Sequence, residues 1–185
     1  MPTLRITGGR VVQPDHTVER ADVLIDQDAG TILEVGDTDR GDDTLDADDG
    51  LVIPGLVNAH THVAMTLLRG FVEDQPLEQW LEETVWPVEA ALEPADVRAG
   101  ARLGVAEMIR AGITAFSDMY FEVSETAAVV EQAGVRATLG HTAISVGKES
   151  AAAHADMEQS LAVAREVDGA ADGRIRATVQ PHNPA

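Results

Sequence analysis

The chain has 185 residues and a net charge of −19, because 13 lysines and arginines stand against 32 aspartates and glutamates. This acidic surplus excludes nucleic acids and anionic membranes as partners, while a hydrophobic content of 44% is sufficient for a folded core. The chain contains no cysteine, which excludes disulfides and thiol nucleophiles and leaves His, Asp and Glu as the available metal ligands.

The first 35 residues consist of short β-type runs separated by turns. The runs cover residues 4–7, 11–12, 23–25 and 32–35, and they predict a small antiparallel sheet. Residues 37–50 contain seven aspartates and two glycines, a composition that predicts an acidic loop or linker. We therefore expect a small β domain over residues 1–50, with the linker at 37–50, and a second domain over residues 51–185.

Strand and helix patterns alternate in the second part of the chain. Between Pro94 and Gly112, apolar residues recur at spacings of three and four, which predicts a helix. Further helices are predicted at 123–132 and 151–167, and strands at 113–116, 136–140 and 174–180. Together with the apolar run that ends at His60, four strands alternate with helices, which indicates a parallel sheet or a (β/α) barrel.

His60 and His62 form the most informative short motif. Residues i and i+2 of an extended segment project from the same face, about 6.6 Å apart at ~3.3 Å per residue, so both imidazoles can reach one divalent ion. The alternative is one surface histidine and one hydrogen-bonded core histidine. The position at the end of an apolar strand, just after Pro54 and Gly55, favours the metal site, because barrel enzymes place their chemistry at the C-terminal ends of strands.

The run at residues 50–62, Gly-Leu-Val-Ile-Pro-Gly-Leu-Val-Asn-Ala-His-Thr-His, resembles the start of the barrel in the amidohydrolase superfamily. Within the superfamily it is similar to the branch of 5′-methylthioadenosine/S-adenosylhomocysteine deaminases and chlorohydrolase-like enzymes. Residues 77–89, with Trp-Pro-Val-Glu, and residues 106–121 add to the likeness, which extends from about residue 3 to the end.

The resemblance implies a metal-dependent hydrolase acting on a small-molecule substrate. His60 and His62 would be the first two ligands of one divalent metal, with zinc as the first choice and iron or manganese as alternatives. The metal would activate a water that attacks an electron-poor ring carbon, from which an amine or a chloride leaves. The implied substrates are adenosine derivatives, such as methylthioadenosine or S-adenosylhomocysteine, or related aminated or chlorinated heterocycles.

Three further residues are implied as substrate-binding. Glu89 would accept hydrogen bonds from ribose hydroxyls, and His182 would contact the substrate after the fourth strand. His141 follows the third strand, where many such deaminases have an arginine, so a preference for a carboxylate-bearing substrate is weakened. Structural roles remain open for all three, and Asp118 either orients a ligand histidine or caps the backbone.

The resemblance places the remaining metal ligands and the proton-transferring groups on strands five to eight. A (β/α)8 barrel needs eight strands and about 250 residues, whereas residues 52–185 offer four strands. We therefore expect an α/β chain: the N-terminal half of a (β/α)8 barrel, preceded by a small β-sandwich-type segment, with no catalytic residue of its own. A truncated, inactive fragment is favoured. The alternative is a non-catalytic remnant or a subunit that needs a second polypeptide, and the open edges also predict self-association.

Lys148 is the only lysine, and the acidic residues are spread along the chain. High salt screens the repulsion between such charges, so the composition indicates a high-salt organism. No start resembling a signal peptide and no apolar stretch of ~18 residues is present, which predicts a cytoplasmic protein.

Overall fold

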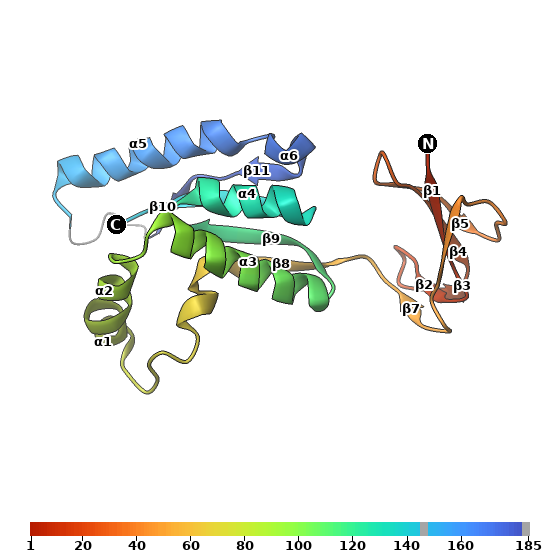
Figure 1. The fold of residues 1–185 in the computed structure, drawn as a ribbon, viewed down its shortest axis with the longest axis horizontal. Helices are drawn as coiled ribbons and strands as arrows, with labels where there is room; N and C mark the ends of the chain where they lie inside the picture. The colour runs from red at the N-terminus through yellow and green to blue at the C-terminus, as the bar shows by residue number, and fades with distance from the viewer. Residues whose placement is uncertain (145–147, 183–185) are drawn as a thin grey trace. The chain divides into compact units, whose positions relative to one another are not determined.

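The computed structural model describes residues 1–144 and 148–182. The chain divides into two compact units, Met1–Pro54 and Gly55–Ala185. Figure 1 traces the first unit in red to orange and the second in yellow to blue. Within the described ranges, no helix is long and apolar enough to cross a membrane.

The first unit contains two small β-sheets. One sheet has the order β5-β4-β1-β6, with β1 at Thr3–Thr7, β4 at Asp22–Asp26, β5 at Thr31–Gly36 and β6 at Asp43–Asp46. The other has the order β3-β2-β7, with β2 at Arg10–Val12, β3 at Val18–Arg20 and β7 at Leu51–Val52. The buried apolar side chains of the unit are Val11, Val23 and Leu24, so its core is small.

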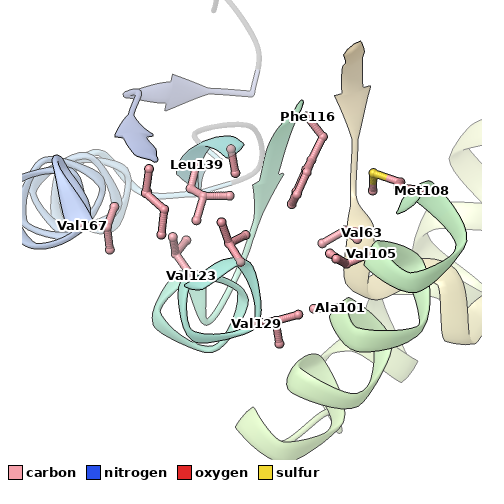
Figure 2. Packing of buried hydrophobic residues seen from close by; sticks show 12 residues of the cluster. Val63, Ala101, Val105, Met108, Phe116, Val123, Val129, Leu139 and Val167 are labelled. Atoms are coloured by element: carbon pink, nitrogen blue, oxygen red, sulfur yellow. The ribbon is translucent and has the colours of Figure 1, made fainter. Parts of the chain in front are cut away.

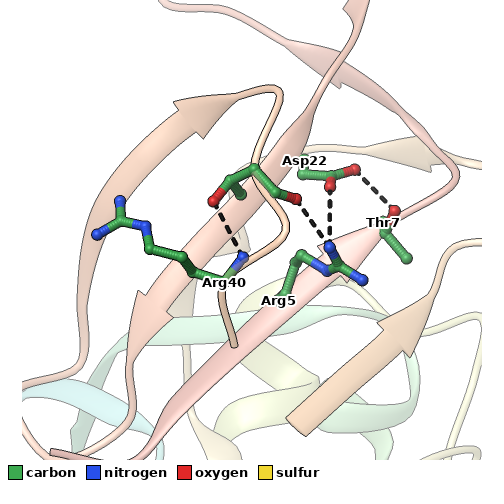
Figure 3. A network of polar contacts seen from close by, with 5 residues as sticks. Arg5, Thr7, Asp22 and Arg40 are labelled. Carbon is green, nitrogen blue, oxygen red and sulfur yellow. Dashed lines mark hydrogen bonds and ion pairs between the residues drawn. The ribbon is translucent and has the colours of Figure 1, made fainter. Parts of the chain in front are cut away.

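A polar network joins β1 and β4 to the segment that follows β5 (Figure 3). Arg5 donates from Nη1 to the backbone oxygen of Thr38 over 2.8 Å and lies 3.9 Å from the Asp22 carboxylate. Asp22 in turn accepts a hydrogen bond of 2.7 Å from the Thr7 hydroxyl. The network places the Asp22 carboxylate beside the Arg5 guanidinium.

Two expectations for the first 50 residues are wrong in part. The sheets are mixed rather than purely antiparallel, because β6 pairs with β1 and β7 pairs with β2 in parallel. The aspartate-rich segment is not loop throughout, since Asp43–Asp46 forms β6. All four residues of β6 are exposed, and the strand is held by backbone hydrogen bonds, for which acidic side chains are no obstacle.

The second unit contains one parallel sheet with strands in the order β11-β10-β9-β8, and β12 pairs with β10 beyond β11. The strands are β8 (Leu56–Thr61), β9 (Ile113–Tyr120), β10 (Arg136–Ala143), β11 (Ile175–Ala177) and β12 (Gln180–Pro181). The predicted alternation of strands and helices is confirmed. The predicted strand at 174–180 is interrupted and forms β11 and β12 instead.

The hydrophobic core of the second unit lies between the sheet and its helices (Figure 2). The helices are α3 (Pro94–Arg110), α4 (Val123–Ala133), α5 (Ser150–Val167) and the short α6 (Ala170–Gly173). Phe116 and Leu139 come from neighbouring strands, and Val105 comes from α3; each is at most 3% exposed. Burying such side chains stabilises the unit by about 1.5–3 kcal/mol each.

The ends of the predicted helices coincide with local signals in the sequence. Pro94 occupies the first turn of α3, where the Asp96 carboxylate accepts a hydrogen bond of 2.9 Å from the Glu93 N–H. Gly112 follows the helix with φ +78°, and Gly134 ends α4 with φ +75°. Both glycines adopt left-handed backbone at little steric cost, which is why these two helices stop there.

Two helical segments between β8 and α3 were not predicted. Residues Val63–Leu68 form a 3₁₀ turn, η1, directly after the His-Thr-His motif. Residues 77–89 form one helical run composed of α1 (Leu77–Trp80), the π-helical η2 (Leu81–Val85) and α2 (Trp86–Glu89). Pro87 has no N–H, so the regular helix ladder cannot continue through it, and the π turn directly precedes α2.

Candidate metal and substrate site

His60 and His62 lie at the C-terminal end of β8, the edge strand of the parallel sheet. Their ring centroids are 5.1 Å apart, and the ring planes are inclined by 83°. Two imidazoles bound to one zinc ion at ~2.0–2.1 Å have ring centroids about 5 Å apart in tetrahedral geometry. The spacing and the donor chemistry therefore fit two adjacent ligands of one divalent metal.

The ring of His62 is held by the neighbouring strand. Its Nδ1 lies 2.6 Å from the backbone oxygen of Met119, and because a carbonyl can only accept, Nδ1 carries the proton. This tautomer leaves the lone pair of Nε2 available for a metal. His60 is exposed, and its backbone N–H donates to Asn58 Oδ1 over 3.3 Å.

Asp118 fixes the backbone immediately after His62. Its Oδ1 accepts a hydrogen bond of 2.6 Å from the N–H of Val63, the first residue of η1. The side chain is buried, and burial raises the pKa of Asp118 to about 6, against the opposing effects of the Val63 N–H and of His62. Of the two roles that the sequence left open, the structure shows the capping one.

Helix α3 packs closely against η1 through two glycines. A Cβ atom at Gly100 would lie 2.2 Å from the backbone oxygen of Ala64, and one at Gly104 would lie 2.7 Å from the Val63 side chain. Both distances are shorter than any Cβ contact allows. The absence of side chains on this face of α3 therefore sets the position of η1, and with it the backbone next to His62.

A pocket of about 120 Å³, the first pocket, opens beside His62. It contains the polar groups of His62, Glu89 and His182 within a largely apolar and aromatic wall. The remaining lining residues are Met65, Trp80, Leu81, Val85, Trp86, Met119, Tyr120, Phe121, Thr142 and Ile144. Few polar groups in an aromatic wall are typical of a site for a flat organic ligand.

Glu89 ends α2 and faces the buried phenol of Tyr120. The Tyr120 hydroxyl donates to Glu89 Oε1 over 2.8 Å. Burial raises the pKa of Glu89, and the Tyr120 hydrogen bond and nearby His62 lower it in part. Within the described residues no other hydrogen bond reaches the Glu89 carboxylate, so it retains acceptor capacity for hydroxyl groups of a ligand.

The two histidines of the later strands take different positions. His182 follows β12, lines the first pocket, and is tied to the end of β10 by its N–H, which donates to Ala143 O over 2.9 Å. His141, on β10, is 7% exposed and lines an adjoining second pocket of about 300 Å³. The two pockets share Glu89, Tyr120, Phe121 and Thr142, so these residues form a wall between them.

The structure thus brings His62, Glu89 and His182 to the first pocket. His60 lies beside His62, and His141 lines the adjoining second pocket. No group of three or more potential metal ligands occurs among residues 1–144 and 148–182. No local pattern identified Tyr120 as a partner of Glu89, because the two residues are 31 positions apart.

Comparisons with known proteins agree on one family. The model of the amidohydrolase family matches residues 51–185. The chain is 65% identical over 185 residues to a 5-methylthioadenosine/S-adenosylhomocysteine deaminase of the halophilic archaeon Haloarcula marismortui, covering 99% of this chain and 43% of that protein. The chain therefore spans less than half the length of this relative.

Two solved structures share the fold. An adenosine deaminase from Xanthomonas campestris with bound zinc has a TM-score of 0.75 and 36% identity, with 96% of this chain and 42% of that chain covered. A triazine hydrolase from Arthrobacter aurescens has a TM-score of 0.83 at 22% identity, with 98% and 46% covered. The predicted fold, the first half of a (β/α)8 hydrolase barrel preceded by a small β segment, is confirmed.

Proposed function

Because the chain belongs to the amidohydrolase family, we propose that it supplies the metal-binding histidine pair and the ribose-binding side of a deaminase acting on adenosine derivatives. Methylthioadenosine, S-adenosylhomocysteine and related aminated heterocycles are the substrate class. The names of the Haloarcula relative and of the Xanthomonas structure support this substrate class. The observation that carries the proposal is the His60–His62 pair at a strand end, 5.1 Å between ring centroids, next to the first pocket.

His60 and His62 would hold one divalent metal. Zinc is the first choice because it is bound in the Xanthomonas structure, and iron or manganese also suit imidazole ligands. When bound, such a metal supplies an acidified water for attack on the ring carbon that carries the amine. The chain's own contribution is orientation, since Met119 fixes the His62 tautomer and Asp118 fixes the backbone that follows.

The first pocket would hold the nucleoside. Trp80, Trp86 and Phe121 offer aromatic faces for a purine, and Glu89 offers its carboxylate to two neighbouring ribose hydroxyls. The Tyr120 hydroxyl keeps the Glu89 side chain in place. His182 follows β12 and lines the same pocket as His62, so it would donate or accept a hydrogen bond at the ligand.

Two imidazoles make an incomplete catalytic metal site, because such sites have three protein ligands. We infer that the further ligands and the proton-transferring groups belong to the part of the relatives that this chain does not span. The exposed apolar side chains of Leu56 (48%) and Val57 (68%) on the edge strand β8 favour a second candidate role, that of a subunit completed by another polypeptide.

The decisive experiment is a chimera in which this chain replaces the matching part of the Haloarcula marismortui relative. In molar KCl the chimera is expected to bind zinc and to release ammonia from methylthioadenosine. His60→Ala and His62→Ala should each abolish both properties. His154→Ala is the matched control, because His154 is exposed on α5 and lines neither pocket.

Two results would contradict the proposal. One is a folded chimera that retains zinc and activity after the His62→Ala change. The other is a folded chimera that neither binds zinc nor deaminates any adenosine derivative. The subunit role is tested with the 185-residue chain and the complementary part of the relative as separate polypeptides, where activity on mixing supports completion by a second chain.

A further inference from the structure

Strands β11 and β12 occupy one position in the sheet beside β10, separated by a short break. Both pair with β10 in parallel, and the register is the same before and after the break at residues 178–179. Two backbone hydrogen bonds flank the break: the Thr178 N–H donates to Leu139 O over 2.9 Å, and the His182 N–H donates to Ala143 O over 2.9 Å. The chain therefore leaves β10 after β11 and returns to it in register just before His182.

Gly140 lies on β10 opposite this break. A Cβ atom at Gly140 would lie 2.2 Å from Gln180 Cγ and 2.7 Å from the backbone oxygen of Thr178. Real Cβ atoms essentially never approach other heavy atoms so closely. The φ of Gly140 lies outside the left-handed region, so its backbone conformation does not require a glycine. The glycine is therefore needed for space, which the segment leading to His182 fills.

The Gln180 side chain is linked to the start of the break. Its Nε2 donates to Thr178 Oγ1 over 2.5 Å, so a side-chain hydrogen bond joins the two ends of the break. Thr178 Oγ1 would itself lie 2.9 Å from a Cβ atom at Gly140. A side chain at Gly140 would therefore meet both partners of this hydrogen bond as well as the backbone.

The face of β10 that carries Gly140 leads to the first pocket. Side chains alternate along a strand, so Gly140 and Thr142 share a face, and Thr142 lines the first pocket. His182 lines the same pocket and follows β12, which has two residues and includes Pro181, a residue without an N–H. Few backbone hydrogen bonds hold β12 against β10, so the place of His182 depends on how closely the break approaches Gly140.

We propose that Gly140 is a positioning residue for the substrate contact made by His182. The bare backbone at Gly140 lets the segment from Thr178 to Gln180 pass close to β10, so that His182 reaches the wall of the first pocket. A methyl group at this position would push the segment outward and withdraw His182 from the pocket. The ligand contact of His182 rests on the proposed function, whereas its placement by Gly140 rests on the packing alone.

Amide hydrogen exchange of the 185-residue chain, followed by NMR in molar KCl, tests the placement without a ligand. In the native chain the His182 N–H is expected to be protected by Ala143 O. Gly140→Ala should lower this protection by roughly tenfold or more, because overpacking displaces the backbone. The reference is the Ala137 N–H, which donates to Arg174 O over 3.1 Å ahead of the break and should keep its protection.

Val130→Ala is the matched control for a general loss of stability. Val130 is fully buried on α4, so the change leaves a cavity in the core and adds no atom near the break. It should lower the protection of His182 no more than that of Ala137. Gly140→Ala, in contrast, should act on His182 selectively.

Adenosine binding, measured by ligand-observed NMR, tests whether the placement matters for the pocket. His182→Ala should weaken binding by about threefold to tenfold, the effect of one hydrogen bond. In the Gly140→Ala chain the same change should have little further effect, because His182 has already left the pocket. In the Val130→Ala chain it should keep its full effect. A merely structural role of Gly140 predicts the same factor in all three backgrounds.

Variants of Gln180 keep the proposal testable if Gly140→Ala does not fold. Gln180→Ala removes the Cγ atom nearest to the added methyl group, so combining it with Gly140→Ala should restore part of the lost His182 protection. The remaining contact with Thr178 O makes the recovery partial. Gln180→Ala alone removes the hydrogen bond to Thr178 and should lower His182 protection by about threefold to tenfold, with Ala137 unchanged.

Three results overturn the inference. They are an unprotected His182 N–H in the native chain, equal His182 protection in the Gly140→Ala and native chains, and an equal effect of His182→Ala on adenosine binding in all three backgrounds. Absence of adenosine binding by the folded native chain contradicts the proposed function. The exchange measurement alone then supports or overturns the placement of His182 by Gly140.

Discussion

The carboxylate of Asp118 holds the backbone N–H of Val63 at 2.6 Å, although the two residues are 55 positions apart in the chain. This contact ties the middle strand β9 to the residue that follows His62. His62 is thus held by β9 at two points: Asp118 binds the backbone that follows it, and Met119 accepts a hydrogen bond from its Nδ1. Its orientation is therefore a property of β9 as much as of β8.

Replacement of Asp118 tests this connection. Asp118→Ala should lower the free energy of unfolding by about 1–3 kcal/mol, because the Val63 N–H loses its acceptor in a buried place. Asp118→Asn retains an acceptor and avoids a buried charge, so it should be at least as stable as the native chain. Urea denaturation in molar KCl measures both. Equal destabilisation by the two variants would contradict the capping role.

Gly100→Ala tests the packing of α3 against η1. In an exposed helix the change would stabilise by about 1 kcal/mol. Here the new Cβ would lie 2.2 Å from Ala64 O, so we expect net destabilisation by about 1–3 kcal/mol and weaker zinc binding by the chimera. Ala99→Gly, at the exposed neighbouring position, is the control and should lower stability by about 1 kcal/mol without affecting zinc. A stabilising Gly100→Ala variant would refute the close contact.

The Tyr120–Glu89 pair predicts how ribose is recognised. Glu89→Ala should remove the preference for adenosine over 2′,3′-dideoxyadenosine, a loss of about tenfold or more because charge-assisted hydrogen bonds contribute ~1.5–3 kcal/mol. Tyr120→Phe should reduce the preference less, since the carboxylate remains but loses its 2.8 Å hydrogen bond. Ligand-observed NMR measures both ratios. Glu82→Ala, at an exposed position of η2, should leave the preference unchanged.

Stability should depend strongly on salt. The net charge of −19 produces self-repulsion that molar KCl screens, because the Debye length falls from about 10 Å at ~0.1 M to about 3 Å at ~1 M salt. The melting temperature followed by circular dichroism should therefore decrease as KCl is withdrawn. Sucrose, which carries no charge, should not replace the salt. A melting temperature independent of KCl would refute the electrostatic explanation.

His141 should make stability fall at acidic pH. Burial lowers its pKa below the ordinary value of 6.5, so the unfolded chain binds this proton more tightly than the folded chain. The stability that comes from keeping His141 neutral in the folded chain is fully present above pH 6.5. It is lost as the pH falls toward the lowered pKa. Thermal melts between pH 7.5 and pH 5 should show a smaller slope for His141→Gln. Exposed His154→Gln serves as the control, and an unchanged slope in His141→Gln would contradict the prediction.

The sequence was sufficient for those elements whose limits depend on local chemistry. Pro94 and Gly112 act within one turn of the chain, and they bounded α3 correctly. Strand β9 was predicted to end at residue 116 but extends to Tyr120, because pairing with β10 stabilises polar residues that have little strand preference of their own. Strand β6 was missed for the same reason, since its partner β1 provides the hydrogen bonds.

In the candidate site, too, some features follow from local sequence and others only from the fold. The spacing of His60 and His62 was enough to propose adjacent ligands, and their roles as ligands remain a prediction. The Tyr120–Glu89 contact and the shared wall of the two pockets depend on residues brought together only by folding. No periodicity or local motif encodes such contacts, so sequence reasoning without coordinates could not name them.

The single lysine of the chain has a practical consequence. Lys148 borders the second pocket with its side chain 38% exposed, and the other basic residues are arginines. Among the side chains of these 185 residues, an amine-reactive fluorophore can therefore modify only Lys148. Labelling would place a fluorescent reporter at the rim of the second pocket without any engineered cysteine. A ligand in the second pocket would slow the reaction of Lys148 with the reagent, so the labelling rate would measure how much of the protein is bound.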